Sequence, residues 1–140
     1  MNHALNSQVQ ARVVDLIEGT PTVGNLLVKP LLAGERMSLL EVRIPAGAAS
    51  AVHAHGHESV IYIVRGRLRT TIDGEVCILG PGDACRHPDR VPHDIEALEE
   101  TVFVEVKSPV PAIADVLGHR SGVADGRLID GLSGPPADDA

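Results

Sequence analysis

The sequence predicts an all-β fold, an antiparallel β-barrel or jelly roll of about six to ten strands. Two observations predict it: the chain consists of short runs of β-branched or alternating residues, and Gly or Pro stands at most of the boundaries between them. In one such run Leu68, Thr70 and Ile72 alternate with polar side chains. One face of that run is therefore expected to be buried and the other to be wet.

Several runs have about the length of a strand. They are residues 23–32, 37–44, 59–64, 67–72, 75–79, 83–87 and 101–107. Asp73 and Gly74 separate two of these runs and are typical of a two-residue hairpin turn, whose central positions both need a positive φ. Residues 9–18 fit either a helix or a first strand, and residues 112–117 fit a short helical turn near the C-terminus.

A chain of 140 residues is expected to form one domain. We expect residues 1–120 to form the barrel and residues 121–140 to be a flexible tail. That tail is rich in Gly, Asp, Ala and Pro and cannot bury enough apolar area to offset its ordering entropy. The N-terminus lacks the pattern of a signal peptide, and no apolar stretch has the length of a membrane span. The expected location is therefore the cytoplasm.

Charge and composition exclude some partners and favour others. The net charge of −7 argues against nucleic acid and against an anionic membrane surface. Tyr62 and Phe103 are the only aromatic residues, so a pocket would have mostly aliphatic walls, which suits a small-molecule ligand or substrate. The long apolar segment 9–32 could extend a sheet edge by pairing with a second chain, and we expect a homodimer.

Histidines are concentrated in the middle of the chain. Five of the seven lie between positions 53 and 93, namely His53, His55, His57, His87 and His93. Residues at i and i+2 of a strand share a face, so His53 and His55 can direct two imidazoles at one metal ion. His57 shares that face only if the strand continues through Gly56. His87 is either a pocket-lining acid–base group or, more commonly for such a residue, a partly exposed strand histidine.

Two groups of residues have a recognisable order and spacing. The first is Gly47, five residues, His53, one residue, His55 and then Gly66 after an apolar run. The second is Gly82, five residues, Pro88, one residue, Arg90, two residues and His93. These groups resemble the first and second motifs of the cupin superfamily, and together they identify the chain as similar to small single-domain cupins.

The resemblance implies a small antiparallel β-barrel that binds one metal ion. It implies His53, His55 and His93 as ligands, and a divalent Zn, Fe, Mn or Ni ion as the cofactor.

The first motif usually adds a Glu or Gln ligand, but Ser59 occupies that position here, and a hydroxyl is a poor ligand for a divalent transition metal. For the fourth ligand we rank water first, His57 second and Glu58 third, because strand parity turns Glu58 to the other face unless a bulge intervenes. The second motif also departs from the family, with Arg90 at a turn position that is usually Gly.

The resemblance favours a metal-dependent enzyme that acts on a small organic molecule inside the barrel. The ion would act as a Lewis acid in an isomerisation, cyclisation or lyase reaction, or, as iron, would bind O₂ in a dioxygenase. The alternative is a non-catalytic cupin that binds a small ligand or a metal as a sensor or storage module. The absence of a Glu or Gln at Ser59 favours this alternative.

Overall fold

The computed structural model describes residues 2–111, and its strands pair antiparallel throughout. A short 3₁₀ turn, η1 (Asn6–Gln8), precedes the strands. The strands are β1 (Arg12–Ile17), β2 (Thr20–Ala33), β3 (Ser38–Ile44), β4 (Glu58–Arg65), β5 (Leu68–Ile72), β6 (Glu75–Leu79), β7 (Ala84–His87), β8 (His93–Ala97) and β9 (Thr101–Ser108). The nine strands of this part of the chain confirm the all-β prediction. The helical turn expected at 112–117 and the tail expected at 121–140 lie outside the described residues.

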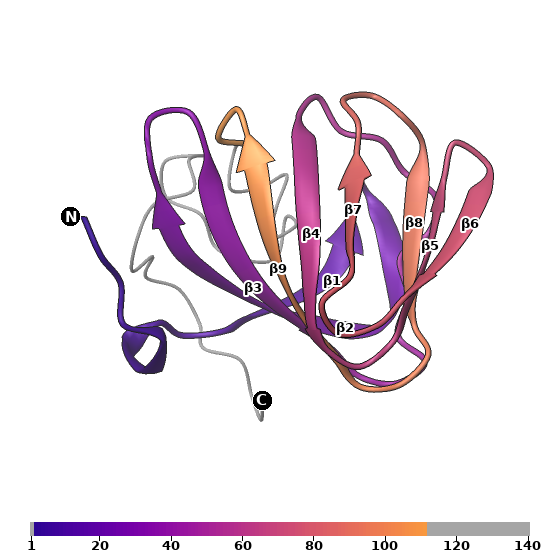
Figure 1. The fold of residues 1–140 in the computed structure, drawn as a ribbon, viewed down its shortest axis with the longest axis horizontal. Helices are drawn as coiled ribbons and strands as arrows, with labels where there is room; N and C mark the ends of the chain where they lie inside the picture. The colour runs from indigo at the N-terminus through magenta and orange to yellow at the C-terminus, as the bar shows by residue number, and fades with distance from the viewer. Residues whose placement is uncertain (1, 112–140) are drawn as a thin grey trace.

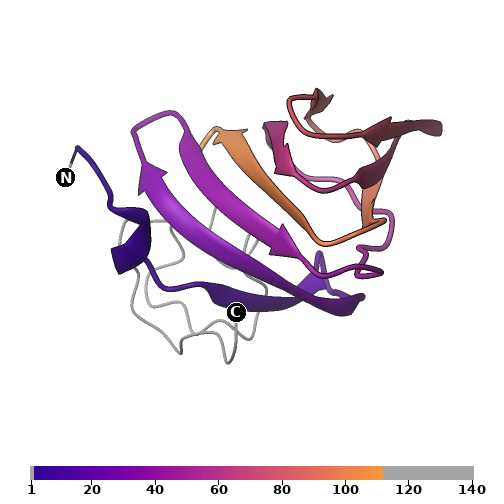
Figure 2. The ribbon, with the colours of Figure 1, turned by 60° about the horizontal axis from the view of Figure 1, so that its bottom comes forward.

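The strands form two sheets that are not joined into a closed barrel. The larger sheet has the order β1-β2-β3-β9-β4-β7, and the smaller has the order β6-β5-β8. Figures 1 and 2 show the smaller sheet on the opposite side of the molecule from β3. Isolated bridges from Ala49 to Val23 of β2 and to Glu96 of β8 connect the sheets through the segment that follows β3. The arrangement is that of a jelly roll, one of the two forms that the sequence predicts.

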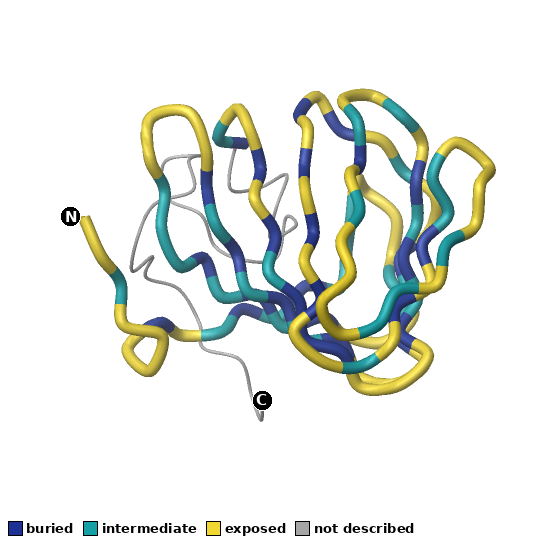
Figure 3. Tube along the Cα trace, in the orientation of Figure 1, coloured by how far each residue is buried: buried dark blue, intermediate teal, exposed yellow. Residues whose placement is uncertain are grey.

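The alternation of residues along the strands places the core between the sheets. In β3, every second residue from Ser38 to Ile44 is buried, and β4 has the same period over Ser59, Ile61 and Ile63. Figure 3 shows this alternation along the strands. Asp73 and Gly74 have φ values of 51° and 81°, which confirms the expected hairpin turn between β5 and β6.

The structure also decides one open alternative and adds a strand. Residues 9–18, which fit a helix or a strand, contain β1 and no helix. The strand β8 was not among the predicted runs, because Asp94 and Glu96 make its sequence polar even though His93, Ile95 and Ala97 are buried. Among residues 2–111 no helix has the length and apolar character needed to cross a membrane.

Candidate metal centre

Three histidines from two distant segments of the sequence lie close together. His53 and His93 form an isolated antiparallel β-bridge. The backbone N–H of each donates to the carbonyl oxygen of the other, at 2.9 and 2.8 Å. Their ring centroids are 4.4 Å apart, and the His55 ring lies 4.6 Å from that of His53 and 5.1 Å from that of His93. The pairing of His53 with His93 is therefore what unites the two motifs.

His53 and His55 do not lie on a regular strand, contrary to the expectation from their spacing. Only His53 makes a bridge, and residues 54–57 have no ladder pairing until β4 begins at Glu58. The side chains converge because this irregular segment passes close to the start of β8.

The three rings are oriented so that one nitrogen of each could hold a metal ion. One potential ligand atom from each of His53, His55 and His93 lies within 4.8 Å of the others. The Nδ1 atoms lie 2.7 Å from the carbonyl oxygen of Ala51, 2.9 Å from Glu18 Oε1 and 3.0 Å from the carbonyl oxygen of Val91, respectively. An acceptor beside each Nδ1 fixes the proton there and leaves each Nε2 with a free lone pair, as metal-binding histidines require.

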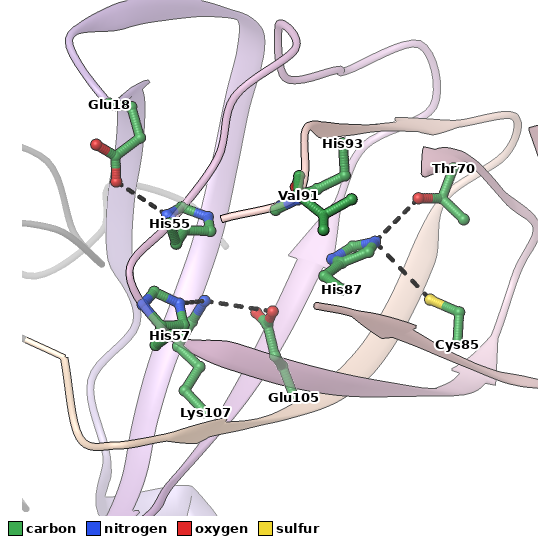
Figure 4. Close-up of polar contacts among 10 residues, drawn as sticks. All are labelled: Glu18, His55, His57, Thr70, Cys85, His87, Val91, His93, Glu105 and Lys107. Carbon is green, nitrogen blue, oxygen red and sulfur yellow. Dashed lines mark hydrogen bonds and ion pairs between the residues drawn. The ribbon is translucent and has the colours of Figure 1, made fainter. Parts of the chain in front are cut away.

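Glu18 orients His55 and could not be identified from the sequence. It occupies the turn between β1 and β2 with a φ of 50°, an uncommon value for a residue other than Gly. Its carboxylate and His55 form the contact at the left of Figure 4. Nothing in the sequence links position 18 to position 55, since the contact depends on the hairpin's place in the fold.

Burial keeps the three imidazoles neutral, which is the form that binds a metal. Desolvation lowers the pKa of His53 and of His93, and it lowers the pKa of His55 to about 2, with a further contribution from the Lys107 ammonium. The donor set and its protonation state therefore fit a divalent transition metal.

Sequence comparison agrees with this geometry. A family model described as "Cupin domain" matches residues 40–106, a range that includes all three histidines. The chain is a cupin-domain protein.

Two curated relatives and a solved structure illustrate the similarity. The cupin is 33% identical over 75 residues to an uncharacterized protein of Methanocaldococcus jannaschii, covering 53% of this chain and 60% of the relative. It is 32% identical over 78 residues to the oxalate decarboxylase OxdC of Bacillus subtilis, covering 52% and 20%, respectively. It thus spans less than two thirds of either relative. The polyketide cyclase RemF of Streptomyces resistomycificus has a similar fold, with a TM-score of 0.65 and 21% identity over 77% of this chain and 79% of the cyclase.

The two residues ranked after water as a fourth ligand do not belong to the group of converging ligand atoms. His57 stacks on His55 at 4.5 Å, but its Nε2 lies 3.0 Å from Lys107 Nζ. Glu58 is exposed and pairs with Arg86 at 3.6 Å, on the outer face that strand parity predicts. Ser59 is buried on the inner face of β4.

The three histidines open onto a small cavity with largely apolar walls. Its accessible volume is about 60 Å³, room for about four to six water molecules. The apolar wall residues are Val14, Ile17, Leu26, Val28, Leu40, Val42, Ile61, Ile95 and Phe103. Aliphatic side chains predominate, as the composition of this cupin predicts, and the size admits only a small molecule.

His87 also lines this cavity, so its interpretation as a partly exposed strand histidine was wrong. It is 2% exposed and stacks on His93 at 4.0 Å. Although β7 is an edge strand, His87 pairs with Ser59 of β4 and shares its inward face. Thr70 donates its hydroxyl proton to the carbonyl of Asp94, so its oxygen accepts the Nε2 proton of His87 at 3.0 Å.

Two charged residues of β9 complete the polar part of the cavity, and neither was identified from the sequence. Glu105 and Lys107 are 8% and 5% exposed and form an ion pair at 3.3 Å, visible to the right of His57 in Figure 4. The alternation of side chains along this strand places Val102, Val104 and Val106 on one face. Its other, inward face therefore contains both charges.

Proposed function

We propose that this cupin is a metal-dependent enzyme that acts on a small organic molecule in the cavity, and that His53, His55 and His93 hold one divalent transition metal ion. The observation that carries the proposal is the set of three convergent imidazoles, each with its Nδ1 beside an acceptor, at the wall of a cavity with largely apolar walls. Paired acceptors of this kind are typical of metal-binding histidines.

The bound ion would supply Lewis-acid polarisation of a substrate oxygen, and iron would add reactivity with O₂. The chain supplies the remaining functions. The apolar wall lowers the local dielectric constant, which strengthens electrostatic interactions within the site. Among the described residues, the Lys107 ammonium contacts His57 and Glu105. An ammonium has three N–H donors, so Lys107 can donate the third to an anionic oxygen of the substrate.

His87 is the best-placed group for moving a proton. Because its Nε2 carries the proton shared with Thr70, its Nδ1 is the acceptor in the neutral ring. Burial lowers the pKa of His87 to about 4, so the ring is neutral at pH 7. We therefore assign His87 Nδ1 the role of accepting a proton from substrate in an isomerisation, cyclisation or oxygenation.

A non-catalytic role as a metal or small-ligand sensor is the second candidate, and the Ser at position 59 favours it. The two are distinguished by incubating the metal-loaded protein with a panel of small hydroxy acids, keto acids and cyclisable ketones and following each compound by mass spectrometry. Conversion of a compound by the wild type, with loss of conversion in His87→Gln at unchanged metal content, supports the enzyme. Binding of compounds without any conversion would refute it.

A further inference from the structure

Glu105 is the only acidic residue among the described residues that line the cavity. Three neutral imidazoles leave the charge of a divalent ion uncompensated, and Lys107 adds a further positive charge beside the site. A buried charge is stable only when an opposite charge or hydrogen bonds accompany it. The carboxylate of Glu105 is therefore the one on the cavity side that can help to neutralise an ion at this site, in addition to that of Glu18 beside His55.

Glu105 stands next to the place where the cupin motif would supply a carboxylate. The strands β4 and β9 are neighbours, and their register pairs Ser59 with Lys107 and Ile61 with Glu105. Position 59 and Glu105 are thus diagonal neighbours on one inward face, a separation that long side chains span. A Ser at position 59 leaves room for both long side chains of β9.

The Ser59 hydroxyl shares this inward face with Glu105. Its Oγ is buried and makes no hydrogen bond of ordinary geometry among the described residues. The Lys107 ammonium lies 3.3 Å from a carboxylate oxygen of Glu105 and favours the ionised form of that carboxylate.

The two other protein candidates for a fourth ligand have partners of their own. Glu58 is on the outer face with Arg86, and His57 is occupied by Lys107. We propose that Glu105, from β9, supplies the carboxylate ligand that the motif's Glu would provide at position 59, and that Lys107 holds this carboxylate in the metal-free protein. This inference rests on the three-histidine site proposed above. In this site the carboxylate ligand comes from β9 and not from position 59 of the adjacent strand β4.

The test must separate ligation by Glu105 from its charge. Three variants share a Met at position 107 and differ only at position 105: K107M, E105Q/K107M and E105L/K107M. The two double variants leave no unpaired buried charge, so they are expected to fold, and circular dichroism checks this. Glu58→Gln, which alters an exposed glutamate of the neighbouring strand, is the matched control. The probe is Co²⁺, with the dissociation constant measured by chelator competition and the coordination by visible absorption.

Ligation predicts a graded series, because a Gln oxygen can still coordinate whereas Leu cannot. Loss of groups outside the ligand set already weakens metal binding by about 10–100-fold, so E105L/K107M should bind Co²⁺ about 100-fold more weakly than K107M. E105Q/K107M should lie between them, with a Co²⁺ spectrum distinct from that of E105L/K107M. Equal affinities and identical spectra for the two double variants would overturn the proposal and leave Glu105 a counter-charge only. Unchanged Co²⁺ binding in His93→Ala would instead refute the three-histidine site itself.

Discussion

Acid should destabilise the metal-free protein strongly, because the fold buries histidines in their neutral form. His55, His57 and His87 are 9%, 6% and 2% exposed. Desolvation is the largest cause that lowers their pKa values, from 6.5 to about 2, about 4 and about 4, respectively. In the unfolded chain each would take up a proton near pH 6.5. The unfolded state therefore binds more protons below that pH, and stability falls as the pH decreases from 6.5 towards 4.

The size of the effect follows from the same values. At pH 5.5, one unit below the unfolded pKa, each of the three rings costs about 1.4 kcal/mol, because the folded rings remain neutral. Together they remove roughly 4 kcal/mol between pH 7.5 and pH 5.5, a large part of the about 5–15 kcal/mol that stabilises a typical domain. Burial lowers the pKa of His53 and His93 as well, which acts in the same direction.

The assay is urea unfolding with excess chelator at pH 7.5 and at pH 5.5, where most carboxylates remain ionised. His87→Leu removes one buried ring, so the difference in unfolding free energy between the two pH values should shrink by about 1.4 kcal/mol. His3→Asn, which changes an exposed histidine, is the control and should leave the difference unchanged. Equal stability of the wild type at both pH values would refute the interpretation of a neutral, buried histidine cluster.

Three other predictions concern positioning, packing and assembly. Glu18→Ala should weaken metal binding by about 10–100-fold, and Glu18→Gln by less, because Glu18 orients His55; equal binding by Glu18→Ala and wild type in chelator competition would contradict this. Gly66→Ala should lower the unfolding free energy by about 1–3 kcal/mol, because Gly66 has a φ of 93° and an added Cβ would overlap the Glu100 carbonyl oxygen. An unchanged urea midpoint would contradict this and show that the segments before β5 and before β9 can separate there. We propose a homodimer, because β1 lies at an edge of the larger sheet and could pair with a second chain. Light scattering at micromolar concentration should give twice the chain mass, and the mass of one chain would exclude the dimer.

The predictable part of this protein is the part encoded by local sequence. Alternating residues and the Asp73–Gly74 turn locate most strands, because period-2 burial and positive φ at a hairpin are local properties. Arg90 likewise adopts a φ of 61° at the motif position where Gly is usual. The spacing also identified His53, His55 and His93, although for a partly incorrect reason, since backbone pairing across two segments brings them together.

The remaining contacts in the cavity depend on which strands are neighbours. Glu105 and Lys107 lie in a strand whose valines dominate its pattern, and only the pairing of β9 with β4 shows that both charges face the histidines. The contact of Glu18 with His55 forms only because the turn between β1 and β2 lies beside the segment that follows β3. For His87, the sequence predicts which residues of its own strand share its face. It does not predict that Thr70 and His93, from other strands, lie beside it.

The central claim, that His53, His55 and His93 hold one metal ion, is tested most directly by metal content. Untagged protein is loaded with Zn²⁺, dialysed at pH 7.5 and analysed for metal per chain in the wild type, His93→Ala and the exposed-histidine control His3→Asn. The three-histidine site requires about one ion per chain in the wild type and in the control, and near-complete loss in His93→Ala, because each histidine supplies one of very few protein bonds. Retention of one tightly held ion by His93→Ala would contradict the site, whatever the fold.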